Sequence, residues 1–222
     1  MSELVISVGA DPELFVLKNR RYISAHGLIP GDKHNPHKVE KGAIQVDGMA
    51  VEFNIDPAFT ANEFVTNIHT VMQHLRDAVG KDHKLVCKPS VRFSKEVWAN
   101  TPPEAMILGC EPDFDAWTSA VNIKPNADVT FRTAAGHVHI GWTKDADVND
   151  PFHRAECEAI VKELDYTLGL PSLILDSDSR RRTLYGKAGA YRPKPYGVEY
   201  RVLSNFWLKK PKYMEWVFNT VQ

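Results

Sequence analysis

The feature that most constrains this chain is a set of strand-like segments in which ionisable residues alternate with apolar ones. His137 and His139 are separated by a valine and followed by an isoleucine, and Glu199 and Arg201 are separated by a tyrosine and flanked by valines. Side chains at positions i and i+2 of a strand point to the same side. Each segment therefore predicts one apolar face against a core and one face that carries imidazole, carboxylate or guanidinium groups.

Two earlier segments repeat this pattern. Glu52 and Asn54 alternate with apolar residues, whereas Asp11 and Glu13 flank Pro12 and share a face if that segment stays extended. Oxygen ligands suit Mg²⁺ and Mn²⁺, and neutral histidine can join them on Mn²⁺ or Zn²⁺. Several carboxylates gathered without a metal would repel one another and raise their pKa values. The four polar faces together predict a divalent cation site.

Each segment taken alone has a simpler interpretation. The two histidines could be a surface or hydrogen-bonded pair, and Glu199 with Arg201 could be a surface ion pair that contributes little to stability. The segment from Asp11 to Glu13 could be an ordinary turn. The order of all four along the chain favours a common site.

The remaining periodicity predicts an α+β domain with a mainly antiparallel sheet, and no repeat or linker divides residues 1–222. We expect strands at 5–8, 14–17, 43–46, 50–55, 85–93, 131, 137–142 and 198–203, with a break at 9–12 and a hairpin turn at Asp47–Gly48. We expect helices at 62–78, 152–168 and 212–218, and irregular chain at 26–41, 100–125 and 186–197. Gly169 and Pro171 should stop the second helix.

Composition excludes several classes of protein. A formal net charge of −1 over 222 residues gives no basic excess for nucleic acid. Cys87, Cys110 and Cys157 are far apart and form no disulfide framework, which favours a reducing compartment. No apolar run approaches the roughly 20 residues of a membrane helix, and we expect no signal peptide. A cytoplasmic protein without nucleic-acid or membrane partners is the expectation.

The order of the segments resembles that of a known superfamily. Residues 9–15 (GADPELF) look like the G-x-E-x-E-[FL]-F strand that presents two carboxylates to metal in glutamine synthetase and glutamate–cysteine ligases. Residues 50–54 resemble the next metal-binding strand, 135–139 the G-x-H-x-H segment, and 197–201 the late strand with a metal-binding glutamate and a phosphate-facing arginine. The tract 180–201 most closely resembles the phage carboxylate–amine (COOH–NH2) amidoligases.

This resemblance implies a fold and an activity. The fold would be a curved, mainly antiparallel sheet with flanking helices, as in the catalytic part of glutamine synthetase. The activity would be ATP-dependent ligation of a carboxylate to an amine through an acyl phosphate, with ATP and Mg²⁺ (or Mn²⁺) as cofactors. The substrates would be small molecules or peptides, a homo-oligomer is possible, and a phage origin would place the enzyme in the host cytoplasm.

The resemblance also implies roles for particular metal and substrate residues. Glu13 and Glu52 would hold one ion, and a second ion would be held by Asp11, His137 and Glu199. Asp11 stands where glutamine synthetase has a glutamate. His139 and Asn54 would contact substrate.

Cationic residues would handle the phosphates. Arg192, Arg182 and Arg201 are expected to stabilise the transferring phosphoryl group, because guanidinium matches phosphate in a bidentate way. Nucleotide binding is expected from Arg201, Arg181 and Lys187. A solvated cationic turn remains an equal alternative for the run of three arginines that begins at Arg180.

Three other functions remain open from the sequence. A metal-dependent hydrolase could use the same histidines and carboxylates to activate water. A phosphotransferase on the same fold could move phosphate to a guanidino group, and a binding module could retain nucleotide without turnover. His26, His34 and His37 lie in the early loop and fit no standard metal spacing, so we expect a loop on the substrate side there.

Overall fold

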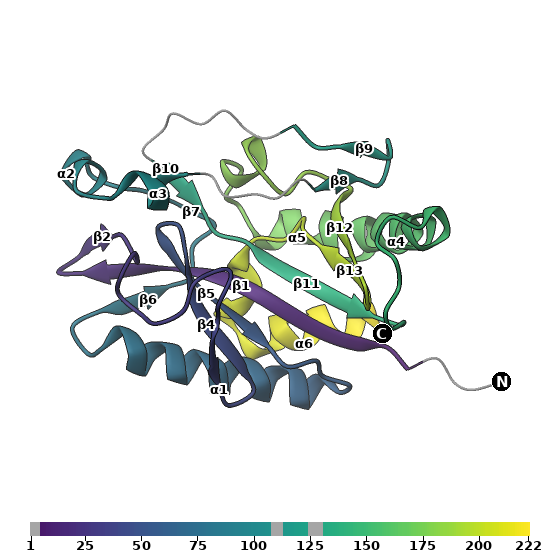
Figure 1. Ribbon diagram of the computed structural model, residues 1–222, viewed down its shortest axis with the longest axis horizontal. Coiled ribbons are helices and arrows are strands. Elements are labelled where there is room, and N and C mark those ends of the chain that lie inside the picture. The colour runs from purple at the N-terminus through teal and green to yellow at the C-terminus, as the bar shows by residue number, and fades with distance from the viewer. Residues whose placement is uncertain (1–4, 108–112, 124–130) are drawn as a thin grey trace.

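The computed structural model describes residues 5–107, 113–123 and 131–222. These residues form a mixed helix-and-strand fold around a large antiparallel sheet (Figure 1). The main path through that sheet runs β3-β4-β5-β1-β11-β13-β12-β8-β9, with β2 and β6 paired to the distal part of β1. The expected combination of helices with a mainly antiparallel sheet is confirmed.

The strands vary widely in length. They are β1 (Ser7–Lys18), β2 (Arg21–Ile23), β3 (His37–Val39), β4 (Gly42–Asp47), β5 (Ala50–Ile55), β6 (Lys84–Val86), β7 (Ser90–Arg92), β8 (Phe114–Asp115), β9 (Ala120–Val121), β10 (Phe131–Thr133), β11 (Gly136–Gly141), β12 (Ala190–Lys194) and β13 (Gly197–Tyr200). Strands β7 and β10 form a separate two-stranded sheet.

The helices lie between and after these strands. The α-helices are α1 (Ala61–Val79), α2 (Lys95–Ala99), α3 (Pro103–Met106), α4 (Pro151–Leu164), α5 (Leu170–Leu175) and α6 (Pro211–Val221). A π-helical turn, η1 (Asp165–Gly169), joins α4 to α5, and two 3₁₀ turns are η2 (Arg181–Thr183) and η3 (Asn205–Lys209). Among the described residues, no helix combines the length and apolar composition that crossing a bilayer requires.

Strand β1 runs without interruption, so the break expected at 9–12 is wrong. Glu13 donates its backbone N–H to Ala135 on the β11 side. Successive backbone nitrogens of a strand alternate in direction, so the nitrogen of Pro12 points to the other side, where pairing with β5 begins only at Glu13. A proline that would donate no ladder hydrogen bond is compatible with a strand. The continuous strand keeps Asp11 and Glu13 on one face.

The sequence predicted that the second long helix stops at Gly169, but the chain remains helical beyond this residue. Helix α4 is capped by the Asp150 side chain, which accepts from Phe152 N–H, and the chain then stays helical through η1 and α5. Gly169 has a helical φ of −59°, and a Cβ there would lie 2.7 Å from the Tyr200 hydroxyl oxygen. Gly169 therefore serves close packing against β13 rather than a cap, and Pro171 is tolerated in the first turn of α5.

Other boundaries also differ from expectation. The loop expected at 186–197 contains strand β12, and the loop at 26–41 contains β3. The strand expected at 85–93 is two short strands, β6 and β7, separated around Pro89. The hairpin of β4 and β5 is confirmed, with Gly48 at a φ of +56° in its turn. Cys87 and Cys157 are free thiols, and Cys110 lies outside the described residues.

The apolar face of the sheet packs against α1, α4 and α6, and Figure 1 shows α1 and α6 along the same side of β1 and β11. Phe64 of α1 stacks on Trp207 at 6.0 Å between ring centroids and meets Phe218 of α6 at 5.7 Å. All three rings are almost fully buried. Because the helices occupy this face, the opposite face of the central strands carries the polar residues.

Replacing Phe64 should therefore weaken the fold as a whole. We expect Phe64→Ala to lower the free energy of unfolding by about 3–5 kcal/mol, since burial and a cavity term add. The matched control is Phe152→Ala, whose ring is 83% exposed and whose loss should change stability by no more than about 0.5 kcal/mol. Urea unfolding followed by circular dichroism measures both, and equal effects would contradict this assignment of the core.

Candidate active site

A cavity of about 530 Å³ opens on the polar face of the central strands. Its size falls within the range of small-molecule sites. Ionisable side chains from β1, β4, β5, β11, β12, an early loop and the segments on either side of β13 line it. They are Asp11, Glu13, Lys33, Asp47, Glu52, His137, His139, Arg192, Lys194, Tyr196 and Arg201.

The strand register explains why these residues meet. Asp11 lies opposite His137 where β1 pairs with β11, and His139 lies opposite Glu199 where β11 pairs with β13. On the other edge of β1, Glu13 lies opposite Glu52 of β5. Directly opposed residues of an antiparallel pair have their side chains on the same face and within contact distance. The sheet thus carries carboxylates and imidazoles across four neighbouring strands.

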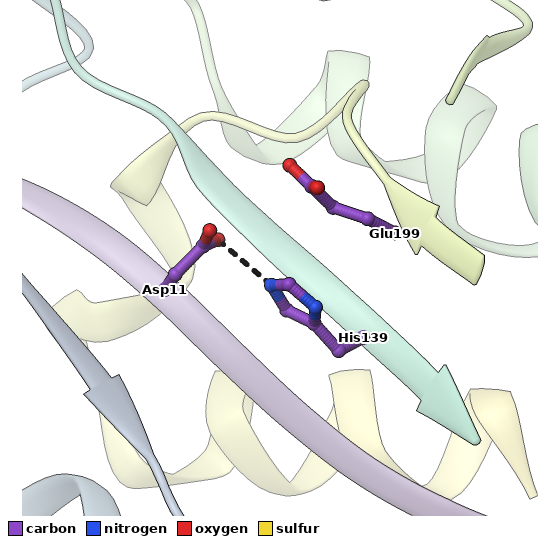
Figure 2. A group of neighbouring side chains, drawn as sticks. All are labelled: Asp11, His139 and Glu199. Atoms are coloured by element: carbon purple, nitrogen blue, oxygen red, sulfur yellow. Dashed lines mark ion pairs between the residues drawn. The ribbon is translucent and has the colours of Figure 1, made fainter. Parts of the chain in front are cut away.

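A compact cluster lies at the centre of this face. Figure 2 shows Asp11, His139 and Glu199 on three neighbouring strands, and one ligand atom from each lies within 4.8 Å of the others. His139 Nε2 is 3.2 Å from Asp11 Oδ1. His137 Nδ1 is 3.3 Å from Asp11 Oδ1 and 3.3 Å from Glu199 Oε1. The donor set of two carboxylates with imidazole suits Mn²⁺ or Mg²⁺.

Burial and mutual charge set the protonation of this cluster. Burial favours the neutral form of Asp11, but the neighbouring His139 and His137 outweigh it and hold the pKa of Asp11 well below its usual range. Burial, with Arg201 beside it, lowers the pKa of His137 to about 4. Burial also opposes ionisation of Glu199, yet Arg201 holds the pKa of Glu199 below its usual value. The cluster therefore contains anionic carboxylates and a neutral His137 near pH 7.

Glu199 is the most heavily paired carboxylate of the site. It is 1% exposed, contacts Arg201 directly, and lies 3.2 Å from Arg192 Nη1 and 2.9 Å from Lys194 Nζ. Arg201 Nε also donates to Asp113 Oδ2 at 3.1 Å. These cations lie on the β12–β13 side of the cavity, so that side can accept further negative charge.

The β4–β5 side of the cavity is acidic. Removal from bulk water, with Asp47 nearby, raises the pKa of Glu13 to about 8. Burial and the charges of Asp11, Asp47 and Glu13 raise the pKa of Glu52 well above its usual value. Gln45 Nε2 donates to Glu52 Oε2 at 2.8 Å, while the buried Gln45 Oε1 has no hydrogen-bond partner among the described residues. Such a group of oxygens is costly when ionised and stabilised by a bound cation.

The structure brings most of the sequence-predicted residues to this cavity. Asp11, Glu13, Glu52, Asn54, His137, His139, Arg192 and Arg201 line it, and Glu199 adjoins it through its ion pairs. The group of ligand atoms with metal-site spacing contains His139, whereas the sequence favoured His137 as ligand, which lies 3.3 Å from both Asp11 and Glu199. Both assignments of metal ligands remain predictions.

Three predicted cations lie elsewhere. Arg181 is buried and donates to the carbonyl oxygens of Val202 and Arg201 at 2.7 and 3.2 Å, so it holds the segment that follows β13. It lines a small neighbouring pocket beside Glu13 rather than the main cavity. Arg182 lies 3.7 Å from Asp176 Oδ2. Lys187 is exposed and does not line the cavity. Their predicted roles in phosphate binding are untested, and this placement does not favour them.

The early loop contributes to the cavity in a way the sequence only partly suggested. Lys33 and Pro36 line the cavity. His26, His34 and His37 are exposed and are not among the lining residues. The loop therefore borders the site through residues other than its histidines.

Sequence reasoning missed several residues of the site. Gln45 and Asp47 alternate with Ile44 and Val46 along β4, so the same i, i+2 pattern could have found them, but Asp47 was assigned to the turn alone. Lys194 follows Arg192 by two residues on β12, within a segment expected to be a loop. Tyr196 and Asp113 carry no local signal, because their position depends on contacts between distant segments.

Comparison with known proteins gives one family. Residues 132–222 match the family described as phage phiEco32-like COOH.NH2 ligase-type 2. The match confirms over this part of the chain the resemblance to phage carboxylate–amine ligases, and it includes His137, His139, Glu199 and Arg201. Asp11, Glu13 and Glu52 precede it, and the strand pairings join them to the matched part. No curated protein matches the sequence.

The raised pKa of Glu13 predicts how stability depends on pH. A carboxyl group whose pKa is higher in the folded state stabilises the fold below its unfolded pKa, near 4.5, and loses that contribution as pH rises through about 8. In the presence of a chelator, the free energy of unfolding should therefore fall between pH 5 and pH 8. We expect Glu13→Gln to reduce this fall and to be more stable than wild type at pH 8 by at least about 1.4 kcal/mol, the equivalent of one pKa unit.

Urea titrations at several pH values measure this effect. Glu104→Gln removes an exposed carboxylate that does not line the cavity and should leave the pH profile of wild type unchanged. A Glu13→Gln profile that coincides with wild type would contradict a raised pKa for Glu13 in the cavity.

Proposed function

We propose that this protein is an ATP-dependent carboxylate–amine ligase with a glutamine synthetase-like catalytic fold, which forms an amide through an acyl phosphate. The observation that carries the proposal is the register of β1, β5, β11 and β13. It joins Glu13, Asp11 and Glu52 from the N-terminal part to the histidines and cations of the part that matches the COOH.NH2 ligase family. The name of that family supports ligation of a carboxylate to an amine.

The residues of the cavity fit a divalent cation. Asp11 Oδ1 and His139 Nε2 are buried and have no hydrogen-bond partner among the described residues, although they lie 3.2 Å apart. Asp11, His139 and Glu199 would hold one ion, and Glu13 with Glu52 would hold another, with Gln45 and Asp47 beside them. Bound Mg²⁺ or Mn²⁺ would neutralise phosphate charge and remove the repulsion among these carboxylates.

The cations of β12 and of the segment that follows β13 would bind the nucleotide phosphates. Arg192 and Arg201 provide guanidinium groups, which match phosphate oxygens in a bidentate way, and Lys194 provides a point charge beside Glu199. In the first step, an oxygen of the substrate carboxylate would attack the γ-phosphorus of ATP, and the bond from that phosphorus to the bridging oxygen would break to release ADP. These cations would stabilise the charge on the transferring group.

The second step needs only an amine and the acyl phosphate. The amine nitrogen would attack the carbonyl carbon, the bond to the phosphate oxygen would break, and inorganic phosphate and a proton would leave. Small-molecule or peptide substrates fit the size of the cavity. A hydrolase would use the same acidic groups but gives no reason for Arg192, Lys194 and Arg201 to gather around Glu199.

Trapping the acyl phosphate tests this proposal. With ATP, Mg²⁺ and a panel of carboxylic acids, hydroxylamine should replace the amine and give a hydroxamate together with equimolar ADP. We expect Glu52→Gln to reduce hydroxamate formation at least about 100-fold, while its metal-free stability at pH 8 is equal to or above that of wild type. Loss of activity without loss of stability would identify a functional carboxylate.

The controls separate the competing functions. Glu104→Gln should keep full activity. A guanidino phosphotransferase would release ADP without hydroxamate, and a hydrolase would turn over without ATP. Failure to bind ATP by calorimetry, with or without Mg²⁺, would overturn the ligase proposal.

The arginines can be separated by a matched pair of substitutions. We expect Arg192→Met to lower kcat about 100-fold or more, as removal of a donor to a transition-state oxyanion does. Arg182→Met removes a guanidinium that lies outside the cavity lining and pairs with Asp176, so its kcat should remain within a few-fold of wild type. Steady-state ADP release at saturating ATP measures both. Equal losses would restore the catalytic role that the sequence predicted for Arg182.

A further inference from the structure

The turn between β12 and β13 carries a tyrosine that reaches the central cluster. The hydroxyl of Tyr196 hydrogen-bonds to Nδ1 of His139. The two rings are 6.0 Å apart between centroids, at an angle of 44°. Tyr196 lines the cavity, and neither the family match nor the sequence pattern gives it a role.

The backbone fixes this turn against the end of β11. The carbonyl oxygen of Tyr196 accepts from Trp142 N–H at 3.0 Å and from Thr143 N–H at 3.2 Å, and the carbonyl oxygen of Pro195 accepts from Ala146 N–H at 2.9 Å. Gly197 follows with a φ of +148°, and a Cβ there would lie 2.2 Å from the carbonyl oxygen of Ile140. The glycine permits this close approach, so the position of the tyrosine ring is set by the strand that carries His139.

The other nitrogen of His139 faces the metal cluster. Its Nε2 atom lies 3.2 Å from Asp11 Oδ1, and it is grouped with the carboxylates of Asp11 and Glu199. Both Nε2 and Asp11 Oδ1 are buried without a hydrogen-bond partner among the described residues. The imidazole therefore has one nitrogen bonded to Tyr196 and one nitrogen left for a ligand.

We propose that Tyr196 is a positioning residue for the divalent cation site: it accepts a hydrogen bond from His139 Nδ1–H and so presents the Nε2 lone pair to the ion. The inference rests on the metal dependence of the proposed function. A metal-ligating histidine commonly donates its second ring N–H to a fixed partner, which sets the tautomer and the ring orientation. Here the partner comes from a turn, and it holds the imidazole between Asp11 and Glu199.

Binding of Mn²⁺ in the absence of nucleotide and substrate tests this role. We expect Tyr196→Phe to raise the calorimetric Kd for Mn²⁺ by about 10-fold or more, the usual cost of losing such a partner. Electron spin-echo spectroscopy of bound Mn²⁺ should show coupling to imidazole nitrogen in wild type, and this coupling should weaken in both Tyr196→Phe and His139→Gln. Tyr166→Phe removes a hydroxyl from an exposed ring outside the cavity and should match wild type in both measurements.

The outcomes separate this inference from the proposed function. Wild-type Mn²⁺ affinity and nitrogen coupling in Tyr196→Phe would overturn the role of Tyr196 and leave the ligase proposal intact. Absence of Mn²⁺ binding by wild type would overturn both the metal site and this inference. Nitrogen-15 NMR of chelated wild type gives an independent result that needs no folded variant: His139 should carry a proton on Nδ1, and an imidazole without a proton on Nδ1 would overturn the inference.

Discussion

The antiparallel pairing of β1 with β11 is the constraint on which the site depends. It places Asp11 opposite His137, although more than half of the chain separates these two residues. Because the side-chain period of a strand is two, a slip of one residue would turn the imidazoles of β11 into the apolar core and its valine and isoleucine into the cavity. The apolar face packed against α1, α4 and α6 therefore fixes the register, and the register assembles the cluster.

The same arrangement creates an electrostatic imbalance within the cavity. On the β12–β13 side, Glu199 stays ionised because Arg192, Lys194 and Arg201 surround it. On the β4–β5 side, the pKa of Glu52 is raised by burial and by neighbouring carboxylates. Breaking a buried pair on the first side is costly, whereas neutralising a carboxylate on the second side is favourable. A cation bound on the acidic side and phosphates bound on the basic side would balance the charge of both sides of the cavity.

The sequence predicted the parts of this site that depend on alternation along one strand. It identified the histidines of β11 and the pair Glu199 and Arg201, since each follows the i, i+2 rule within a few residues. It failed where tertiary contacts override a local signal. Pro12 remains in a strand because its nitrogen faces an unpaired stretch. Gly169 lies within a continuous helix, and its lack of a Cβ leaves room for the hydroxyl of Tyr200. Neither contact can be read from neighbouring residues.

The roles of the arginines in the tract 180–201 also could not be predicted from neighbouring residues. The structure divides these arginines into two groups. Arg192 lies on β12 and lines the cavity, whereas Arg181 is buried and donates to the backbone carbonyl oxygens of Arg201 and Val202, just after β13. Guanidinium can hold either phosphate or backbone oxygens, so residue type does not separate these uses. The supporting element separates them, since Arg192 lies on β12 and Arg181 lies on the 3₁₀ turn η2. Arg181 holds the backbone of Arg201 in place through these two hydrogen bonds, and the position of Arg201 beside Glu199 therefore depends on a cation that does not line the main cavity.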